Sequence, residues 1–134
     1  VEYSEKKGIA KLKPYTSTDY LPIKSLNIPK EKVYLLTNIN RGGEFLNTRP
    51  EDALKEIVAR GKTPLTIDEG IALITQFPQF LIKNNCFSLP GSRMGNQTVP
   101  AIWINGEKQA NLGWCWDRNP HTWLGSAFAS GRIS

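Results

Sequence analysis

The sequence predicts a compact α+β domain with a mainly antiparallel sheet and two principal helices. Its strand-like and helical segments are grouped rather than regularly alternating, which disfavours a parallel α/β sheet. Two stretches, residues 48–61 and 66–77, carry the capping residues and the apolar spacing of helices. An Asn-Gly dipeptide at residues 105–106 separates two strand-like runs, and this dipeptide is the strongest short signal for a β-hairpin.

The composition is that of an ordinary soluble domain. The chain has 134 residues, of which 40% are hydrophobic and 22% charged, so it can bury a core without metal or disulfide staples. No apolar run approaches the roughly 18 residues of a membrane span. The first residues lack the apolar core of a signal peptide. We therefore expect a cytoplasmic protein without membrane contact, and a first residue that is Val rather than Met indicates a trimmed start.

The chain is expected to divide into an N-terminal arm and one domain. Residues 1–32 carry three prolines and no helical period, which predicts an extended arm with short edge strands. Residues 33–134 form the predicted single α+β domain. Residues 33–39 (VYLLTNI) begin this domain as a buried strand that a Gly-Gly turn ends. Residues 44–46 are expected to extend this strand into a hairpin.

Capping patterns predict the beginning of both helices. Thr48 is followed three residues later by Glu51, with Pro50 in the first turn, and Gly61 is placed to end this helix. Thr66 repeats the pattern with Glu69 at the start of the second helix.

Apolar spacing predicts the buried face of the second helix, whose stripe is Ile67, Ile71, Ile74 and Phe77. Pro78 ends or kinks this helix. Asp68 and Glu69 point about 100° apart on a helix, so we expect them to support the helix N-terminus rather than to share a proton or a metal.

The predicted hairpin joins residues 99–104 (VPAIWI) to residues 111–116 across the Asn-Gly turn. Trp103 is expected to meet Trp114 or Trp116 across the two strands. The end of the chain, residues 121–134, is rich in Gly, Ser and Ala and is expected to form a tail.

Residues 112–126 (LGWCWDRNPHTWLGS) hold three of the four tryptophans, one of the two cysteines and the only histidine. Aromatic walls with a few converging polar groups are typical of a small-ligand pocket, and Gly91 and Ser92 give a loop in which backbone N–H groups and an Arg fork can reach an anion. The predicted ligand-binding residues are Arg93, Trp114, Trp116, Arg118, Asn119, His121 and Trp123. The alternative is that the tryptophans are core residues and the histidine is a structural hydrogen-bond partner.

A Cys–His pair is the candidate for catalysis. Cys115 and His121 lie six residues apart, and Asp117 or Asn119 could orient the imidazole. The alternative is a buried structural cysteine, because strand alternation turns Cys115 away from its two Trp neighbours.

No cofactor and no structural metal are expected. Two cysteines and one histidine cannot complete a zinc site unless carboxylates join them, and the two thiols are expected to stay reduced. The formal net charge is +5. Because no block of like charges and no nucleic-acid-binding motif accompanies it, we do not expect nucleic acid as a partner.

Several long motifs suggest a family. GKTPLTIDEGIAL, NNCFSLPGSR, PAIWI and LGWCWDRNPHTWLGS follow one another in this order. Together with YLLTNINRGGEFLNTRPEDAL they resemble an uncharacterised bacterial domain family, best known from actinobacterial proteins and catalogued as a domain of unknown function. The likeness runs from about residue 33 to residue 128, and residues 1–32 match it loosely. It implies no reaction, ligand or catalytic residue.

The sequence therefore predicts a binding module. Its expected ligand is a small anionic or nucleotide-like molecule, or a short peptide, at the C-terminal Trp/Arg/His surface. One alternative is a hydrolase or transferase that uses Cys115 and His121. A second alternative is a protein-interaction domain whose exposed aromatics dock Pro-rich peptides.

Overall fold

A computed structural model gives the structure of the chain and describes residues 8–23, 26, 28–30 and 33–133. The helices are α1 (Pro50–Ala59) and α2 (Ile67–Gln76). The strands are, in chain order, β1 (Ile9–Ala10), β2 (Leu21–Pro22), β3 (Leu35–Thr37), β4 (Thr63–Pro64), β5 (Cys86–Ser88), β6 (Ser92–Arg93), β7 (Thr98–Ile104), β8 (Ala110–Trp116), β9 (Leu124–Ser126), β10 (Phe128–Ala129) and β11 (Gly131–Ile133).

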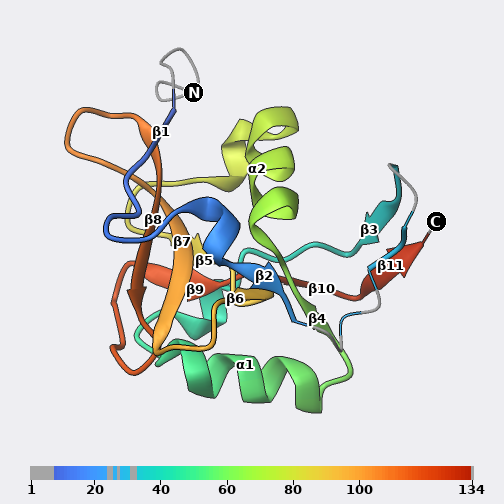
Figure 1. The fold of residues 1–134 in the computed structure, drawn as a ribbon. Coiled ribbons are helices and arrows are strands. Elements are labelled where there is room, and N and C mark those ends of the chain that lie inside the picture. Colours follow the sequence, from blue (N-terminus) through green and yellow to red (C-terminus); the bar gives the residue numbers. More distant parts are fainter. Residues whose placement is uncertain (1–7, 24–25, 27, 31–32, 134) are drawn as a thin grey trace.

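The largest sheet has five strands in the order β1-β8-β7-β5-β9. The pairs β7–β8 and β5–β7 are antiparallel, whereas β1 runs parallel to β8 and β9 parallel to β5. Three two-stranded antiparallel pairs, β4–β10, β3–β11 and β2–β6, surround it. In Figure 1, α1 and α2 lie at opposite ends of the molecule, and the β3–β11 pair stands away from the large sheet. This arrangement confirms the predicted α+β class with two principal helices.

The predicted hairpin forms, with Trp103 directly opposite Asn111. Its turn is longer than the two residues expected from Asn-Gly alone, because the Asn105 N–H donates to Gln109 O at 3.0 Å. A two-residue turn would have placed Trp103 opposite Lys108. The observed register differs by three positions, and an odd shift moves a side chain to the other face of a strand pair. The expectation that Trp103 meets Trp114 or Trp116 is therefore wrong: Trp103 lies over Gly113.

One of the two predicted capping boxes is confirmed. The Thr66 hydroxyl accepts the Glu69 N–H at 3.3 Å, and the Glu69 carboxylate accepts the Thr66 N–H at 3.0 Å. Thr48 does not cap α1: the N-cap is Arg49, which makes no side-chain capping bond. Pro50 restricts the residue before it to an extended backbone, which moves the helix start one residue along. A distant carbonyl caps the first turn instead, because the Glu51 N–H donates to Asp117 O at 2.9 Å.

The predicted helix ends agree with the structure. Gly61 follows the last turn of α1 with a φ of 71°, the left-handed conformation that glycine adopts without penalty. The last residue of α2 is Gln76, and Pro78 starts a short 3₁₀ helix, Pro78–Phe80.

The buried face of α2 differs from the predicted stripe. The buried residues are Ile67, Glu69, Gly70 and Leu73, whereas Ile71 and Phe77 are exposed. A Cβ on Gly70 would overlap the side chain of Leu89, so the helix meets the core along this glycine and its neighbours. Glu69 on the same face of the helix forms a buried ion pair with Arg132, which also keeps this face toward the interior.

The strand and hairpin predicted for residues 33–46 are also wrong in part. Only Leu35–Thr37 form a strand, and Leu35 is exposed because β3 belongs to an outlying pair of strands. Residues Gly43–Phe45 form a 3₁₀ turn instead of a return strand. The Asn40 side chain accepts the Gly42 N–H at 2.7 Å, and Phe45 packs against Phe128, so this segment closes over α1.

The predicted C-terminal tail is wrong, because residues 124–133 contribute three strands. Leu124, Ala127, Phe128 and Ala129 are buried. At Gly125 a Cβ would overlap the backbone of Gly42, so this glycine lets β9 pass close to that segment, and β11 lies beside β3 (Figure 1).

The described part of the N-terminal arm packs against this body. β1 pairs with the edge of β8 and β2 pairs with β6. Leu12 and Tyr20 are buried in the main hydrophobic core. No helix in the described residues has the length and apolar character needed to cross a membrane.

Candidate functional site

A groove lies between α2 and the chain around β3, and we call it the α2–β3 groove. Its volume is about 730 Å³. One wall consists of Ile28, Val33, Tyr34, Leu35, Leu36 and Ile39. The other wall consists of Asp68, Glu69, Ala72, Leu73, Gln76 and Phe77. Aliphatic and aromatic side chains predominate, and a few polar groups lie among them, which is the composition typical of a binding site.

Three large apolar side chains of this groove lie open to solvent. Val33 is 82% exposed, Leu35 is 65% exposed and Phe77 is 48% exposed. Single exposed apolar residues are common on protein surfaces, but a group of them around one concavity indicates an interaction site. The three residues come from both walls, so one bound chain could cover them together.

The same wall carries an unpaired strand edge. β3 has β11 on one side, and no other described strand lies beside it. An edge strand presents backbone N–H and C=O groups that a further extended chain can pair with.

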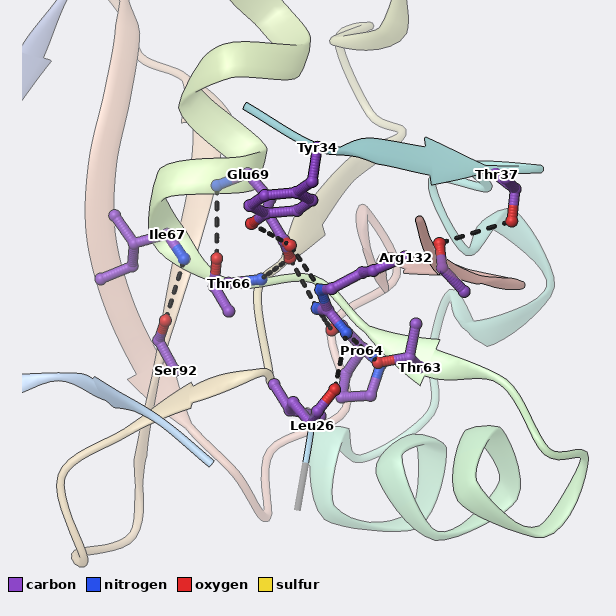
Figure 2. A network of polar contacts seen from close by, with 11 residues as sticks. Leu26, Tyr34, Thr37, Thr63, Pro64, Thr66, Ile67, Glu69, Ser92 and Arg132 are labelled. Carbon is purple, nitrogen blue, oxygen red and sulfur yellow. Dashed lines mark hydrogen bonds and ion pairs between the residues drawn. The ribbon is translucent and has the colours of Figure 1, made fainter. Parts of the chain in front are cut away.

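Glu69, which lines the groove, forms a buried ion pair with Arg132 (Figure 2). The Arg132 guanidinium donates to both carboxylate oxygens, from Nε at 2.6 Å and from Nη2 at 2.7 Å. Both side chains are only 3% exposed. Arg132 also donates to Thr63 Oγ1 at 2.6 Å and to the Pro64 carbonyl at 3.0 Å. A two-bond Arg–carboxylate contact is the strongest geometry available to such a pair.

Tyr34 joins this network from the β3 side of the groove. Its hydroxyl donates to Glu69 Oε2 at 2.6 Å. Burial and the hydrogen bond to the Glu69 carboxylate raise the pKa of Tyr34 to about 12. The tyrosine is therefore neutral at physiological pH, and its hydroxyl ties the β3 segment to α2.

The ionisation of the pair follows from the same contacts. Burial opposes the charged form of Glu69, but hydrogen bonds from Arg132, Tyr34 and the Thr66 N–H outweigh it and hold the pKa of Glu69 below its ordinary value. Burial likewise opposes the charged form of Arg132, and the Glu69 carboxylate raises the pKa of Arg132 overall. Since both Glu69 oxygens accept hydrogen bonds, this carboxylate is held in place and is not available as a general base.

The sequence-predicted site residues separate onto different parts of the molecule. Trp114 and Trp116 lie on one face of β8, with ring centroids 4.9 Å apart, and Tyr15 packs edge-on against Trp114 at 5.6 Å. The Trp114 indole N–H donates to Lys13 O at 3.0 Å. Trp116 is exposed.

Trp123 and His121 pack near Trp103, which lies on the other face of the hairpin. The ring centroids of His121 and Trp123 are 5.3 Å apart, and those of Trp123 and Trp103 are 6.0 Å apart. The lone histidine therefore lies against a tryptophan of the motif. The His121 carbonyl also accepts the Asn47 N–H at 2.7 Å, so the residue supports the local fold.

Three of the four polar residues predicted to bind the ligand, Arg93, Arg118 and Asn119, do not gather at one point. Arg93 donates to the buried Asp117 carboxylate at 2.7 Å. Arg118 is exposed and lies 3.7 Å from Glu51 at the start of α1. Asn119 is exposed in the turn after β8. The structure therefore places the seven predicted residues in at least three separate environments.

Cys115 has the environment of a core residue. It is buried, and burial together with the nearby Asp117 carboxylate raises the pKa of its thiol to about 12. Nucleophilic cysteines need a lowered pKa, so this environment opposes the role that the Cys–His alternative requires. Cys86 and Cys115 are free thiols. In the described residues, no cluster of three or more His, Cys, Asp or Glu could hold a metal ion.

Comparison with known proteins assigns a family. The family of unknown function DUF5701 matches residues 1–134. The chain belongs to this family. No curated protein and no solved structure matches the chain.

Sequence reasoning missed the groove and the ion pair beside it. Glu69 was recognised through its capping pattern, but its partner lies 63 residues away in the chain, and no local pattern reports such a contact. The available signal was Arg132, a lone charge in a run of small and apolar residues (FASGRI). A charge in such a run needs a buried partner if the run packs inside the protein.

Proposed function

We propose that this DUF5701 domain is a binding module that takes up an extended, largely apolar peptide segment in the α2–β3 groove. The observation that carries this proposal is the combination of Val33, Leu35 and Phe77, exposed around one groove, with an edge of β3 beside which no described strand lies. The prediction of a short-peptide ligand is thereby kept, and its location moves away from the C-terminal Trp/Arg/His surface.

An extended peptide is the occupant that suits both features of this groove. An edge strand offers alternating N–H and C=O groups, which only another extended backbone can match along its length. The apolar walls offer contacts to alternate side chains of that backbone. A lipid chain or an apolar small molecule would cover the walls but would leave the backbone groups of β3 without protein partners.

A second cavity, about 490 Å³ in volume, is a weaker candidate for the binding site than the α2–β3 groove. It lies between α2 and the large sheet and is lined mainly by aliphatic residues such as Ile71, Ile74 and Ile102. Its one side-chain hydroxyl, on Thr75, already donates to Ile71 O at 2.7 Å. This cavity is smaller and offers few directional contacts, so it has less means of selecting a ligand.

Binding is favoured over catalysis by the state of the titratable groups. The Glu69 carboxylate is satisfied by Arg132, Tyr34 and the Thr66 N–H, and the pKa of Cys115 is about 12 because of burial and the Asp117 carboxylate. Neither group has the properties of an activated base or nucleophile.

The first test is a selection of random dodecapeptides, displayed on phage, against the full chain. The selected peptides should carry apolar residues at alternate positions. Synthetic copies with N-methylated backbone amides at alternate positions should lose at least about tenfold in affinity. Each lost backbone bond costs about 1 kcal/mol, so two lost bonds exceed the roughly 1.4 kcal/mol of a tenfold change. Undiminished binding of every N-methylated copy would contradict strand addition.

A matched pair of variants tests the location. Leu35 and Ile133 lie directly opposite each other on β3 and β11. Both are exposed, at 65% and 56%, but only Leu35 lines the groove. Leu35→Asp should abolish binding of the selected peptides while Ile133→Asp leaves it within about twofold, and both variants should keep the wild-type circular dichroism spectrum. Equal loss in both variants, or no loss in either, would refute the groove as the site.

A further inference from the structure

We infer that the peptide bound in the α2–β3 groove carries a cation at the end of the groove formed by the first turn of α2, where it faces Asp68. This inference rests on the proposed function and adds the charge class of the ligand. Its basis is the charge of the groove walls, taken group by group.

Of the described residues that line the groove, three have ionisable side chains. Tyr34 is neutral, since burial and Glu69 raise its pKa to about 12. The charge of Glu69 is compensated by Arg132, which contacts both carboxylate oxygens. Among the described lining residues, Asp68 is left as the acidic group whose side chain has no charged partner.

The position of Asp68 makes this charge available to a ligand. It lies in the first turn of α2, one residue before Glu69, and it is exposed. No described residue forms an ion pair or a side-chain hydrogen bond with its carboxylate. Lys30 and Arg41, the described cations nearest in sequence to the β3 wall, do not line the groove. As far as the described residues define it, a bound chain therefore meets the Asp68 carboxylate at one end of a mainly apolar groove.

A charge at the rim of a binding site acts mainly on the association rate and on its salt dependence. Opposite charge on the ligand is attracted over about a Debye length, whereas like charge is repelled. A peptide with a cation should therefore associate faster than its neutral analogue, and a peptide with a carboxylate should associate more slowly.

Two parts of a peptide can supply the cation. One is a Lys or Arg side chain, and the other is the α-amino group of a free N-terminus. The chemistry that Asp68 recognises is shared by both. Acetylation of the N-terminus removes only the second source, so it distinguishes the two.

The test uses the best-binding dodecapeptide from the phage selection, synthesised with Lys, norleucine or Glu at each position in turn. Every peptide is prepared with a free and with an acetylated N-terminus. At one terminal region the Lys peptide or the free amine should bind roughly three- to tenfold more tightly than the Glu or acetylated peptide at low salt. The preference should shrink as salt is raised to about 0.5 M.

Asp68→Asn and Asp52→Asn form the variant pair. Asp52 occupies the first turn of α1 as Asp68 occupies that of α2, but it does not line the groove. Asp68→Asn should remove the charge preference and its salt dependence while the norleucine peptide binds unchanged. Asp52→Asn should keep the preference.

The outcomes separate this inference from the proposed function. If the peptides bind the groove but the ratio of Lys to Glu affinity is the same in wild type and Asp68→Asn, the inference that a ligand cation faces Asp68 is refuted. The proposed peptide site is then still supported. If Leu35→Asp leaves binding intact, or if no peptide is selected, the peptide site itself is wrong and the inference is overturned with it.

Discussion

Two Arg–carboxylate pairs in this domain differ sharply in how completely they are satisfied. Arg132 and Glu69 share two bonds, and Tyr34, Thr63 and the Thr66 N–H complete the network. The pair Arg93–Asp117 has one contact of 2.7 Å. In that pair Arg93 Nε and Asp117 Oδ1 are both buried without a hydrogen-bond partner.

The difference assigns the two pairs different roles. A buried ion pair resists removal of one partner because the other is left uncompensated. The pair Arg132–Glu69 connects β11, α2 and the β3 segment, so it holds both walls of the α2–β3 groove. The Arg93–Asp117 pair is less constrained and sits where β6 and β8 end. The predicted ligand surface around Arg93 and the tryptophans stays a prediction.

The largest expected difference between the two ion pairs is the loss of stability when the arginine of each pair is replaced by alanine. Arg132→Ala should lower the free energy of unfolding by about 3–5 kcal/mol, because Glu69 is left buried without its partner. Arg93→Ala should cost less, about 2–3 kcal/mol. It removes the bonds to Asp117 and to Asn96 O and leaves Asp117 without its partner, but the Arg93 side chain is 20% exposed, so water can partly replace it. Urea denaturation measures both.

A second arginine variant keeps this contrast testable if Arg132→Ala does not fold. Arg132→Lys retains the charge but loses the two-bond fork, and it should still destabilise the fold more than Arg93→Lys. Equal losses at the two arginines would remove the distinction between the pairs.

The pH dependence of stability provides the next contrast. The pKa of Glu69 is lowered from its ordinary value of 4.5, since hydrogen bonds from Arg132 and Tyr34 outweigh its burial. A group with a lowered pKa in the folded state contributes stability above its unfolded pKa and loses that contribution as the pH falls through the folded pKa. Wild-type stability should therefore fall below about pH 4.5. Glu69→Gln should be less stable at pH 7 and should show a shallower fall in acid.

Tyr34→Phe serves as the intermediate case in this pH experiment. It removes one of the hydrogen bonds that favour the Glu69 carboxylate. The loss of stability of Tyr34→Phe as the pH falls should therefore be smaller than that of wild type and larger than that of Glu69→Gln. A Glu69→Gln variant with the wild-type acid slope would show that Glu69 does not carry the pH dependence.

The smallest expected effect concerns the threonine that holds Glu69 at the start of α2. Thr66→Ala removes the hydroxyl that accepts the Glu69 N–H and should cost about 1 kcal/mol. Thr48→Ala is the matched control, because α1 is capped at Arg49 and from Asp117 O instead, and it should change stability by no more than a few tenths of a kcal/mol. A comparable loss at Thr48 would contradict the assigned start of α1.

Local signals were sufficient for part of this fold. The Thr66–Glu69 box, the Gly61 helix end and the β7–β8 hairpin each depend on residues within a few positions of one another, and all three are confirmed. The Asn-Gly dipeptide did not predict which face of the hairpin each side chain occupies, because the length of the turn sets the register of the two strands. The Thr48 cap failed because a proline two residues later moved the helix start.

The candidate site depends on contacts that the sequence does not encode locally. Arg132 contacts Glu69 and Leu26 O, residues 63 and 106 positions away, and β3 meets β11 across the whole chain. Residues 124–131 are mostly small, as in a flexible tail. In the structure their small size lets the chain pack in the interior, where Ala127 and Ala129 are fully buried. The concentration of tryptophans drew attention to residues 112–126, but alternation along β8 and the turn of the hairpin divide them between two faces.

The central claim is that an extended peptide adds to the edge of β3. Amide hydrogen exchange of Leu35, Leu36 and Thr37, measured by NMR with and without a saturating selected peptide, tests it most directly. The account predicts that the β3 amides not bonded to β11 become at least about tenfold more protected, while those of β7 and β8 exchange as before. Unchanged exchange in β3 with new protection around Trp114 and Trp116 would contradict it.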